Sequence, residues 1–186
     1  MNEATKFGLY DSAFEKSSCG VGFLTRKDGK QTHDLLIKGH EALCAVPHRG
    51  GMSAEGVGDG AGVSIDLSIE FFNRVTDSLL NLGEFGVGNF FLPNDPAQHE
   101  RARELVDAAL KAEGIKTLVT RDVEVDYSVL NSAAIKCQLP IAQWVFAAPA
   151  GVRGIQLDKA IHRALMAIEA EAYTNSALNG IYALRM

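Results

Sequence analysis

Three short blocks in the first third of the chain constrain its fold most strongly. Residues 19–23 are Cys-Gly-Val-Gly-Phe, residues 48–51 are His-Arg-Gly-Gly, and residues 58–62 are Gly-Asp-Gly-Ala-Gly. Glycine allows close backbone approach and unusual dihedral angles, so the last two blocks predict one long, shaped loop over residues 48–62. A cysteine beside glycine at the head of an apolar strand is open to a substrate. The polar residues 1–18 are interpreted as a leader or loosely tethered arm that stops before this thiol.

Composition describes one globular domain and excludes several classes of protein. The chain has 186 residues, which is long enough to bury a core without disulfides. Its residues are 47% hydrophobic and 22% charged, a balance typical of globular proteins. A net charge of −5 without a basic patch argues against nucleic-acid binding. No apolar run approaches the roughly 20 residues of a membrane span, and no secretory signal is present. Three cysteines without a Cys-x-x-Cys pair indicate reduced thiols, no metal site and a cytoplasmic protein.

The spacing of apolar residues predicts interspersed helices and strands, without an internal repeat, in an α+β sandwich. Helices are expected over residues 33–46, around 71–75, over 96–113 and around 161–172, and strands over 19–25, 63–67, 85–92, 115–125 and 141–148. Thr32 and Asp95 are the expected N-caps of the first and third helices. Near the end, the runs 173–178 and 181–184 flank Asn179-Gly180, a pair typical of a tight hairpin.

The three blocks, in this order, resemble the amino-terminal glutaminase domain of glutamate synthases, which are class II glutamine amidotransferases. The resemblance extends from about residue 8 to residue 186. It implies the four-layer αββα sandwich of the N-terminal nucleophile hydrolases, incomplete here at its C-terminal end. It also implies that residues 19–186 form the amidotransferase domain and that residues 1–18 are removed.

Cys19 is the candidate nucleophile. Taken alone, a cysteine at the start of an apolar strand is more often a small buried hydrophobe. The resemblance implies instead that Cys19 becomes the first residue of the mature chain, where its own α-amino group accepts the thiol proton. The thiolate then attacks the carboxamide of L-glutamine, ammonia leaves, and a glutamyl thioester is hydrolysed. Cys44 and Cys137 are expected to be structural, with Cys44 facing the core.

The glycine-rich loop carries the other candidate residues. Arg49 either pairs with a substrate carboxylate or holds the loop through hydrogen bonds to backbone carbonyls, and the second role is slightly favoured. The loop does not suit a nucleotide, because it lacks the Lys-Ser/Thr of a P-loop and precedes a strand instead of following one. The residues expected to organise this loop beside Cys19 are His48, Arg49, Gly50, Gly58, Asp59 and Gly60.

Other motifs of the family do not occur in residues 1–186. These are the Gln-Arg-Phe-Ser-Thr segment for the substrate α-carboxylate, the Asn-Gly-Glu-Ile-Asn oxyanion motif and a later aspartate. Since one oxyanion donor is worth roughly 10² to 10³ in rate, whether the chain alone is an enzyme stays open. It is either a glutaminase that supplies ammonia to a synthase domain or subunit, or a catalytically inactive amidotransferase-like fold that binds a partner subunit or a regulator. FMN and an iron–sulfur cluster are implied only for the rest of a glutamate synthase, and no cofactor is expected here.

Overall fold

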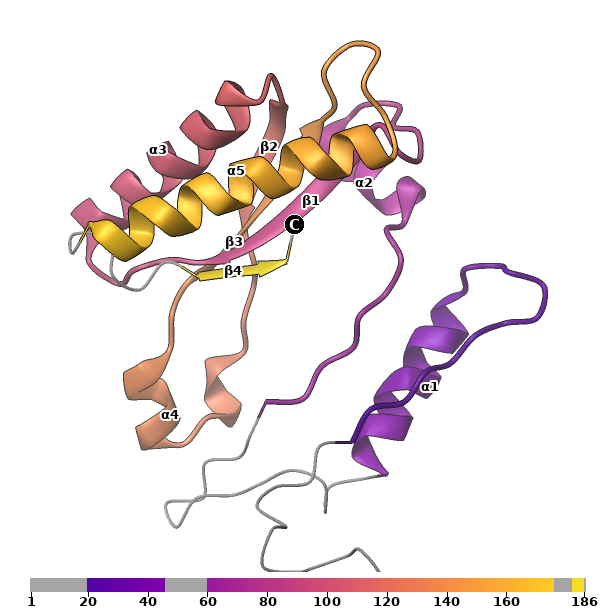
Figure 1. Cartoon of the computed structure of the whole chain (residues 1–186). Coiled ribbons are helices and arrows are strands. Elements are labelled where there is room, and N and C mark those ends of the chain that lie inside the picture. Colours follow the sequence, from indigo (N-terminus) through magenta and orange to yellow (C-terminus); the bar gives the residue numbers. More distant parts are fainter. Residues whose placement is uncertain (1–19, 46–59, 176–181, 186) are drawn as a thin grey trace, which may run out of the picture. The chain divides into compact units, whose positions relative to one another are not determined.

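The computed structural model describes residues 20–45, 60–175 and 182–185, the last four by their backbone (Figure 1). The chain divides into two compact units: unit 1 comprises Met1–Asp66 and Leu130–Ala134, and unit 2 comprises Leu67–Val129 and Ile135–Met186. The elements in chain order are α1 (His33–Cys44), α2 (Ile69–Thr76), β1 (Phe85–Phe91), α3 (Pro96–Ala112), β2 (Lys116–Asp122), the 3₁₀ turn η3 (Tyr127–Val129), α4 (Ser132–Cys137), β3 (Ile141–Ala147), α5 (Ile155–Thr174) and β4 (Tyr182–Arg185).

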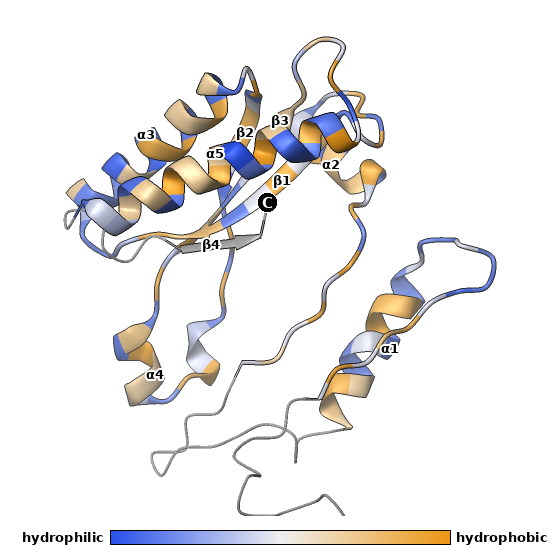
Figure 2. Cartoon of the chain, viewed as in Figure 1, coloured by the Kyte–Doolittle hydropathy of each residue, from blue (hydrophilic) through white to orange (hydrophobic). Residues whose placement is uncertain are grey.

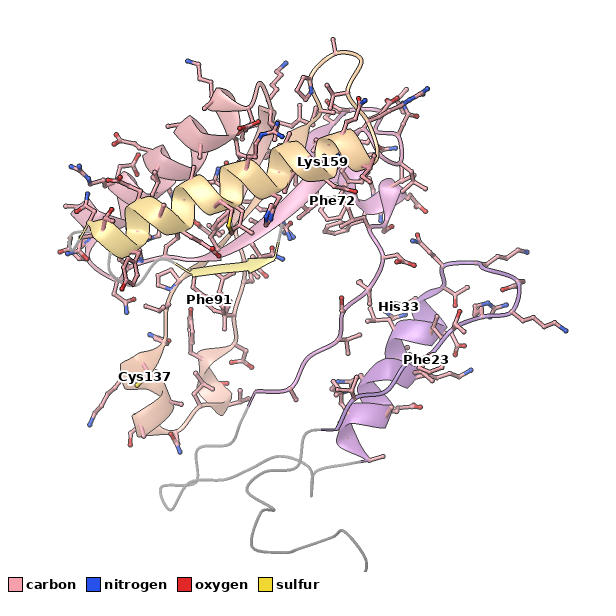
Figure 3. The ribbon with its side chains drawn as sticks, viewed as in Figure 1. Phe23, His33, Phe72, Phe91, Cys137 and Lys159 are labelled. Carbon is pink, nitrogen blue, oxygen red and sulfur yellow. The ribbon has the colours of Figure 1, made fainter. Side chains whose placement is uncertain are left out.

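Unit 1 is built on α1. The helix begins after Thr32, as predicted, but the Thr32 hydroxyl makes no cap hydrogen bond, and no residue of α1 is buried. A turn at residues 27–28 precedes the helix and is held by an ion pair of 2.8 Å between Arg26 and Asp28. An ion pair of 2.9 Å between Asp34 and Lys38 lies on the surface of the helix. Apolar side chains of this unit, including Phe23 (Figure 3), are strongly exposed.

Two predicted strands are not formed. Residues 20–26 and 60–68 alternate in polarity or size as expected, yet neither segment has strand structure. A period-two pattern becomes a strand only where a neighbouring strand supplies hydrogen bonds to its backbone. The described part of unit 1 contains no strand at all, so that partner is missing there.

Unit 2 is organised around one antiparallel sheet with the strand order β2-β3-β1-β4. The two central strands, β1 and β3, pair without irregularity over their full length, from Phe85 opposite Ala147 to Phe91 opposite Ile141. β2 pairs along the other edge of β3 with one irregularity, and the short β4 pairs with β1. The predicted mixture of helices and strands is therefore confirmed.

One face of the sheet is covered by α3 and α5, which run side by side (Figure 1). Both helices are amphipathic (Figure 2), and their apolar sides meet the sheet in the main core. Trp144 lies at its centre, fully buried, with the ring of Phe90 edge-on at 5.2 Å. The core is completed by Leu92, Ala102, Val106, Ala109, Leu110, Ile115, Ala142, Phe146, Leu157, Ala160, Ile161, Ala164 and Ile168.

The opposite face of the sheet carries a smaller cluster beneath α2. Phe72 of α2 packs with Phe85 of β1 and Val145 of β3, and Figure 3 labels Phe72 at this point. Ile69, Val75, Leu80, Val87 and Val119 are partly buried around the cluster. Beyond α2, the side chains of Asn89, Phe91, Ile141 and Gln143 are only half-buried.

The helices and strands of unit 2 follow the predicted positions closely, except near the end of the chain. Tyr173 and Thr174, predicted to begin a strand, instead form the last turn of α5. Because these two residues are helical, the first strand of the hairpin predicted around Asn179-Gly180 does not begin at Tyr173. β4, which covers the expected second strand, pairs with β1. Asn179 and Gly180 themselves lie outside the described residues. The α4 helix and the turn η3 were not predicted, because neither has a periodic apolar pattern.

Candidate functional site

Most of the predicted site lies outside the described residues. This holds for Cys19, His48, Arg49, Gly50, Gly58 and Asp59, whose roles stay predictions. Gly60 is described and is exposed; a Cβ built on it meets no atom within 4 Å, and its backbone is not left-handed. No close packing in the described structure therefore explains a glycine at this position.

The two other cysteines are both exposed. Cys44 ends α1, and its Sγ lies 3.7 Å from Nε2 of His40, one turn earlier on the same helix. The expectation that Cys44 faces a core is therefore wrong. Only Leu35, Gly39 and Leu43 of α1 are half-buried, on the side of the helix where Val63 lies close to Gly39. Cys137 ends α4 (Figure 3), and both thiols are open to reagents in solution.

A polar network surrounds the buried Trp144. Its indole Nε1–H donates to Oδ1 of Asp107 at 3.0 Å, and the Thr117 hydroxyl donates to the same oxygen at 3.0 Å. The Arg103 guanidinium lies 5.6 Å from the Trp144 ring centre and forms an ion pair with Asp122. These contacts join α3 to β2 and β3, so the network holds the helix on the sheet around Trp144.

His99 belongs to the same network through Arg103. Arg103 donates through Nε to Nε2 of His99 at 3.0 Å, while Nδ1 lies 3.2 Å from the Pro93 carbonyl oxygen. A nitrogen that accepts carries no proton, so the neutral ring with its proton on Nδ1 satisfies both contacts. This geometry fixes the start of α3 against the preceding turn.

A second polar group, not predicted from the sequence, lies on the sheet face that carries α2. Arg121 of β2 donates through Nε to Oε1 of Gln143 at 2.9 Å, and Nε2 of Gln143 donates to Oδ1 of Asn89 at 2.9 Å. The three residues are cross-strand neighbours on β2, β3 and β1. A signal was present: Asn89 and Gln143 each interrupt an otherwise apolar strand. Recognising that they face one another required the strand register.

Exposed ion pairs set the protonation of several carboxylates. Hydrogen bonds from the Arg163 guanidinium hold the pKa of Glu113 below its usual value and link the end of α3 to α5. Arg26 likewise lowers the pKa of Asp28. The hydroxyl and backbone amide of Ser128 lower the pKa of Asp126. These contacts stabilise the turns at residues 27–28 and 126–128 and the contact between α3 and α5.

A cavity of about 440 Å³ lies between the α2–β1 and β3–α5 loops. Backbone hydrogen bonds of 2.8 Å from Gly154 to Gly83 and from Ala148 to Glu84 hold the loops together. Its lining contains Glu84 and Arg153 but no cysteine, serine or histidine. The cavity therefore offers no nucleophile.

Metal ligands and membrane spans are both absent from the described residues. No three His, Cys, Asp or Glu side chains within them come together as metal ligands. No helix among them is long and apolar enough to cross a membrane.

Comparison with known proteins relates the chain to one family. Residues 19–186 match the class-II glutamine amidotransferases. The chain is 36% identical over 153 residues to ferredoxin-dependent glutamate synthase 2 of Synechocystis sp., across 80% of this chain and 10% of that protein. It is 33% identical over 143 residues to the large chain of glutamate synthase [NADPH] of Bacillus subtilis, across 75% and 9%. The corresponding chain of Azospirillum brasilense is 30% identical over 183 residues, across 96% and 12%.

The family match covers all the elements of both units, and the chain spans about a tenth of the length of these relatives. The resemblance inferred from the three glycine-containing blocks is thus confirmed. The chain belongs to the class-II glutamine amidotransferases and is related to the amino-terminal region of glutamate synthases.

Proposed function

We propose that this chain carries the glutamine-hydrolysing chemistry of a glutamate synthase-like protein, with Cys19 as its nucleophile. The observation that carries the proposal is the start of the family match, which falls on Cys19 itself. The family places its nucleophile at the first residue of the mature domain. A match that begins at a cysteine supports that role for Cys19 and a leader function for residues 1–18.

The chemistry needs a free amine at Cys19. While Ser18 is bonded to Cys19, the nitrogen of Cys19 is an amide and cannot accept a proton. After cleavage the α-amino group takes the thiol proton, and the sulfur forms a bond to the carboxamide carbon of glutamine. The carbon–nitrogen bond breaks, and ammonia leaves with the transferred proton. Water then cleaves the thioester to release glutamate and restore the thiol.

The same membership supports the four-layer sandwich of N-terminal nucleophile hydrolases as the complete fold. Unit 2 contains one antiparallel sheet with α3 and α5 packed on one face. A sheet covered by a helical layer is half of such a sandwich. The second sheet and its helices are inferred from the family.

Glutamine is the proposed substrate, and a synthase domain or subunit is the proposed recipient of ammonia. Both follow from relatives named as glutamate synthases. Because the chain spans about a tenth of those proteins, the synthase reaction, its FMN and its iron–sulfur cluster are assigned to other regions. This chain is proposed to bind none of these cofactors.

The decisive experiment labels the protein with a glutamine-like diazo-ketone after measuring its intact mass. We expect a chain that begins at Cys19 to be labelled at Cys19, with protection by glutamine. The Cys19→Ala variant should lose both labelling and glutaminase activity. Cys44→Ser and Cys137→Ser are matched controls that remove an exposed thiol and should retain both.

Two outcomes would favour the alternative, a catalytically inactive fold that binds a partner. One is an intact mass that still includes residues 1–18 when the protein is isolated from its native source. The other is diazo-ketone labelling at Cys44 in preference to Cys19, without protection by glutamine.

A further inference from the structure

The side of α5 that faces away from the sheet carries a regular stripe of exposed residues. The buried residues of the helix meet the main core, and the stripe lies about half a turn from them around the helix axis. Its members, which we call the outer stripe, follow one another at intervals of four and three residues: Ile155, Lys159, His162, Met166, Glu169 and Tyr173. This is the heptad spacing that aligns the contact positions of two paired helices.

The outer stripe exposes large apolar side chains to water. Ile155 is 70% exposed, Met166 43% and Tyr173 91%. An amphipathic helix normally presents polar residues on the side opposite its core. In the four-layer sandwich proposed above, the helices form the outermost layers, so the outer stripe does not meet the second sheet. Apolar residues at heptad spacing on such a surface are typical of contact with another helix.

Two charges in the outer stripe determine which helix fits it and in which direction. Lys159, labelled in Figure 3, lies about 15 Å from Glu169 along the axis, too far for an ion pair within one helix. No residue three or four positions from either of them carries the opposite charge. In an antiparallel second copy, Lys159 of one helix lies level with Glu169 of the other, twice over. A parallel copy would place like charges opposite one another, which is unfavourable.

The same two-fold arrangement pairs the rest of the outer stripe. The axis lies at the level of Ala164, which is midway between Lys159 and Glu169 in the sequence. Ala164 is likewise midway between the apolar ends of the stripe. An interface with two-fold symmetry requires this self-complementarity. The residues opposite one another are then Ile155 and Tyr173, Lys159 and Glu169, and His162 and Met166.

We propose that the outer stripe of α5 binds a second copy of this chain, as an antiparallel helix pair with two-fold symmetry. A contact between single helices buries less than the roughly 1,200 Å² of stable complexes, so the dimer is weak and forms at high protein concentration. Dilute unfolding experiments therefore report on the monomer. The interface uses residues of unit 2 only and is independent of the chemistry proposed for Cys19.

The test measures self-association of the whole chain by sedimentation equilibrium over a concentration series. We expect Lys159→Glu and Glu169→Lys each to weaken association roughly tenfold or more, because each places like charges opposite one another. The double variant Lys159→Glu/Glu169→Lys should regain the original association. Since the two positions are too far apart to pair within one helix, this rescue arises only between copies. Lys116→Glu, an exposed lysine at the start of β2, is the matched control and should associate as the original chain does.

A mixture of the two single variants gives the sharpest result. Each variant repels its own kind, but Lys159→Glu and Glu169→Lys together restore two pairs of opposite charge, so a heterodimer should form. Far-UV circular dichroism verifies that every variant is folded. The proposal is overturned if the chain stays monomeric up to about 1 mM, whether or not another protein binds it. It is equally overturned if folded Lys159→Glu associates like the original chain, or if neither the mixture nor the double variant regains association.

Discussion

Gly86 of β1 lies directly opposite Phe146 of β3, and the Phe146 ring occupies the space that a side chain on Gly86 would fill. A Cβ built on Gly86 would overlap Cε2 of that ring. It would also lie 2.9 Å from its Cζ and 3.1 Å from Cδ1 of Ile161. Glycine is thus required here for close packing between the sheet and α5.

The Gly86→Ala variant should be destabilised by about 1–3 kcal/mol, because the Phe146 ring and α5 must move to admit a methyl group. Urea unfolding measures the loss. Gly22→Ala is the control, since a Cβ there meets no atom within 4 Å. Equal unfolding midpoints for the two variants would contradict the packing argument.

Removing the Asp107 carboxylate should expose the cost of an unsatisfied indole N–H. Trp144 is fully buried, and its Nε1–H donates to Asp107 at 3.0 Å. We expect Asp107→Ala to cost about 1–3 kcal/mol, and Asp107→Asn to cost less because an acceptor oxygen remains. Trp144 is the single tryptophan of the chain, so its fluorescence reports the unfolding directly. Alanine and asparagine variants of equal stability would refute this role for the carboxylate.

The two helix N-caps provide a matched pair. Oδ1 of Asp95 accepts a hydrogen bond from the Gln98 amide at 3.0 Å at the start of α3. The Thr32 hydroxyl at the start of α1 is buried and has no hydrogen-bond partner among the described residues. Asp95→Ala should therefore cost about 1 kcal/mol, whereas Thr32→Ala should cost little or nothing. Chemical denaturation of both variants tests this, and a larger loss for Thr32→Ala would reverse the assignment.

The contact between Glu113 and Arg163 predicts a pH dependence. Because Arg163 lowers the pKa of Glu113 in the folded state, its contribution to stability is present above the unfolded pKa of glutamate. That contribution is lost as the pH falls through the folded pKa. Glu113→Gln should remove this part of the acid sensitivity, measured as the urea midpoint between neutral and acidic pH. Glu169→Gln, an exposed residue of α5, should leave the profile unchanged.

The elements predicted well are those specified by nearby residues. The Asp95-Pro96 start and the Gly114 stop define α3, and a short apolar run defines β3. The pairing of β4 with β1 joins segments far apart in the chain, and no local pattern contains it. The same holds for Arg121 and Gln143, whose contact depends on the register of β2 against β3.

The family-level prediction succeeded for a different reason. The three glycine-containing blocks have fixed identities and order, so they indicate relatives even though periodicity says nothing about them. The role of Cys19 within that family rests on chemistry, and it stays a prediction that labelling can test.

The order of the strands bears on how the protein is made. β3 lies between β2 and β1, yet it is the last of the three to be synthesised. Until residue 147 has left the ribosome, β1 and β2 have no neighbouring long strand, and the apolar side of α3 has no sheet to cover it. Such non-local pairing delays folding and leaves aggregation-prone surface exposed in the meantime. A nascent chain interrupted before β3 would therefore keep this surface exposed, whereas the seven residues of β3 supply the strand that joins β1 to β2.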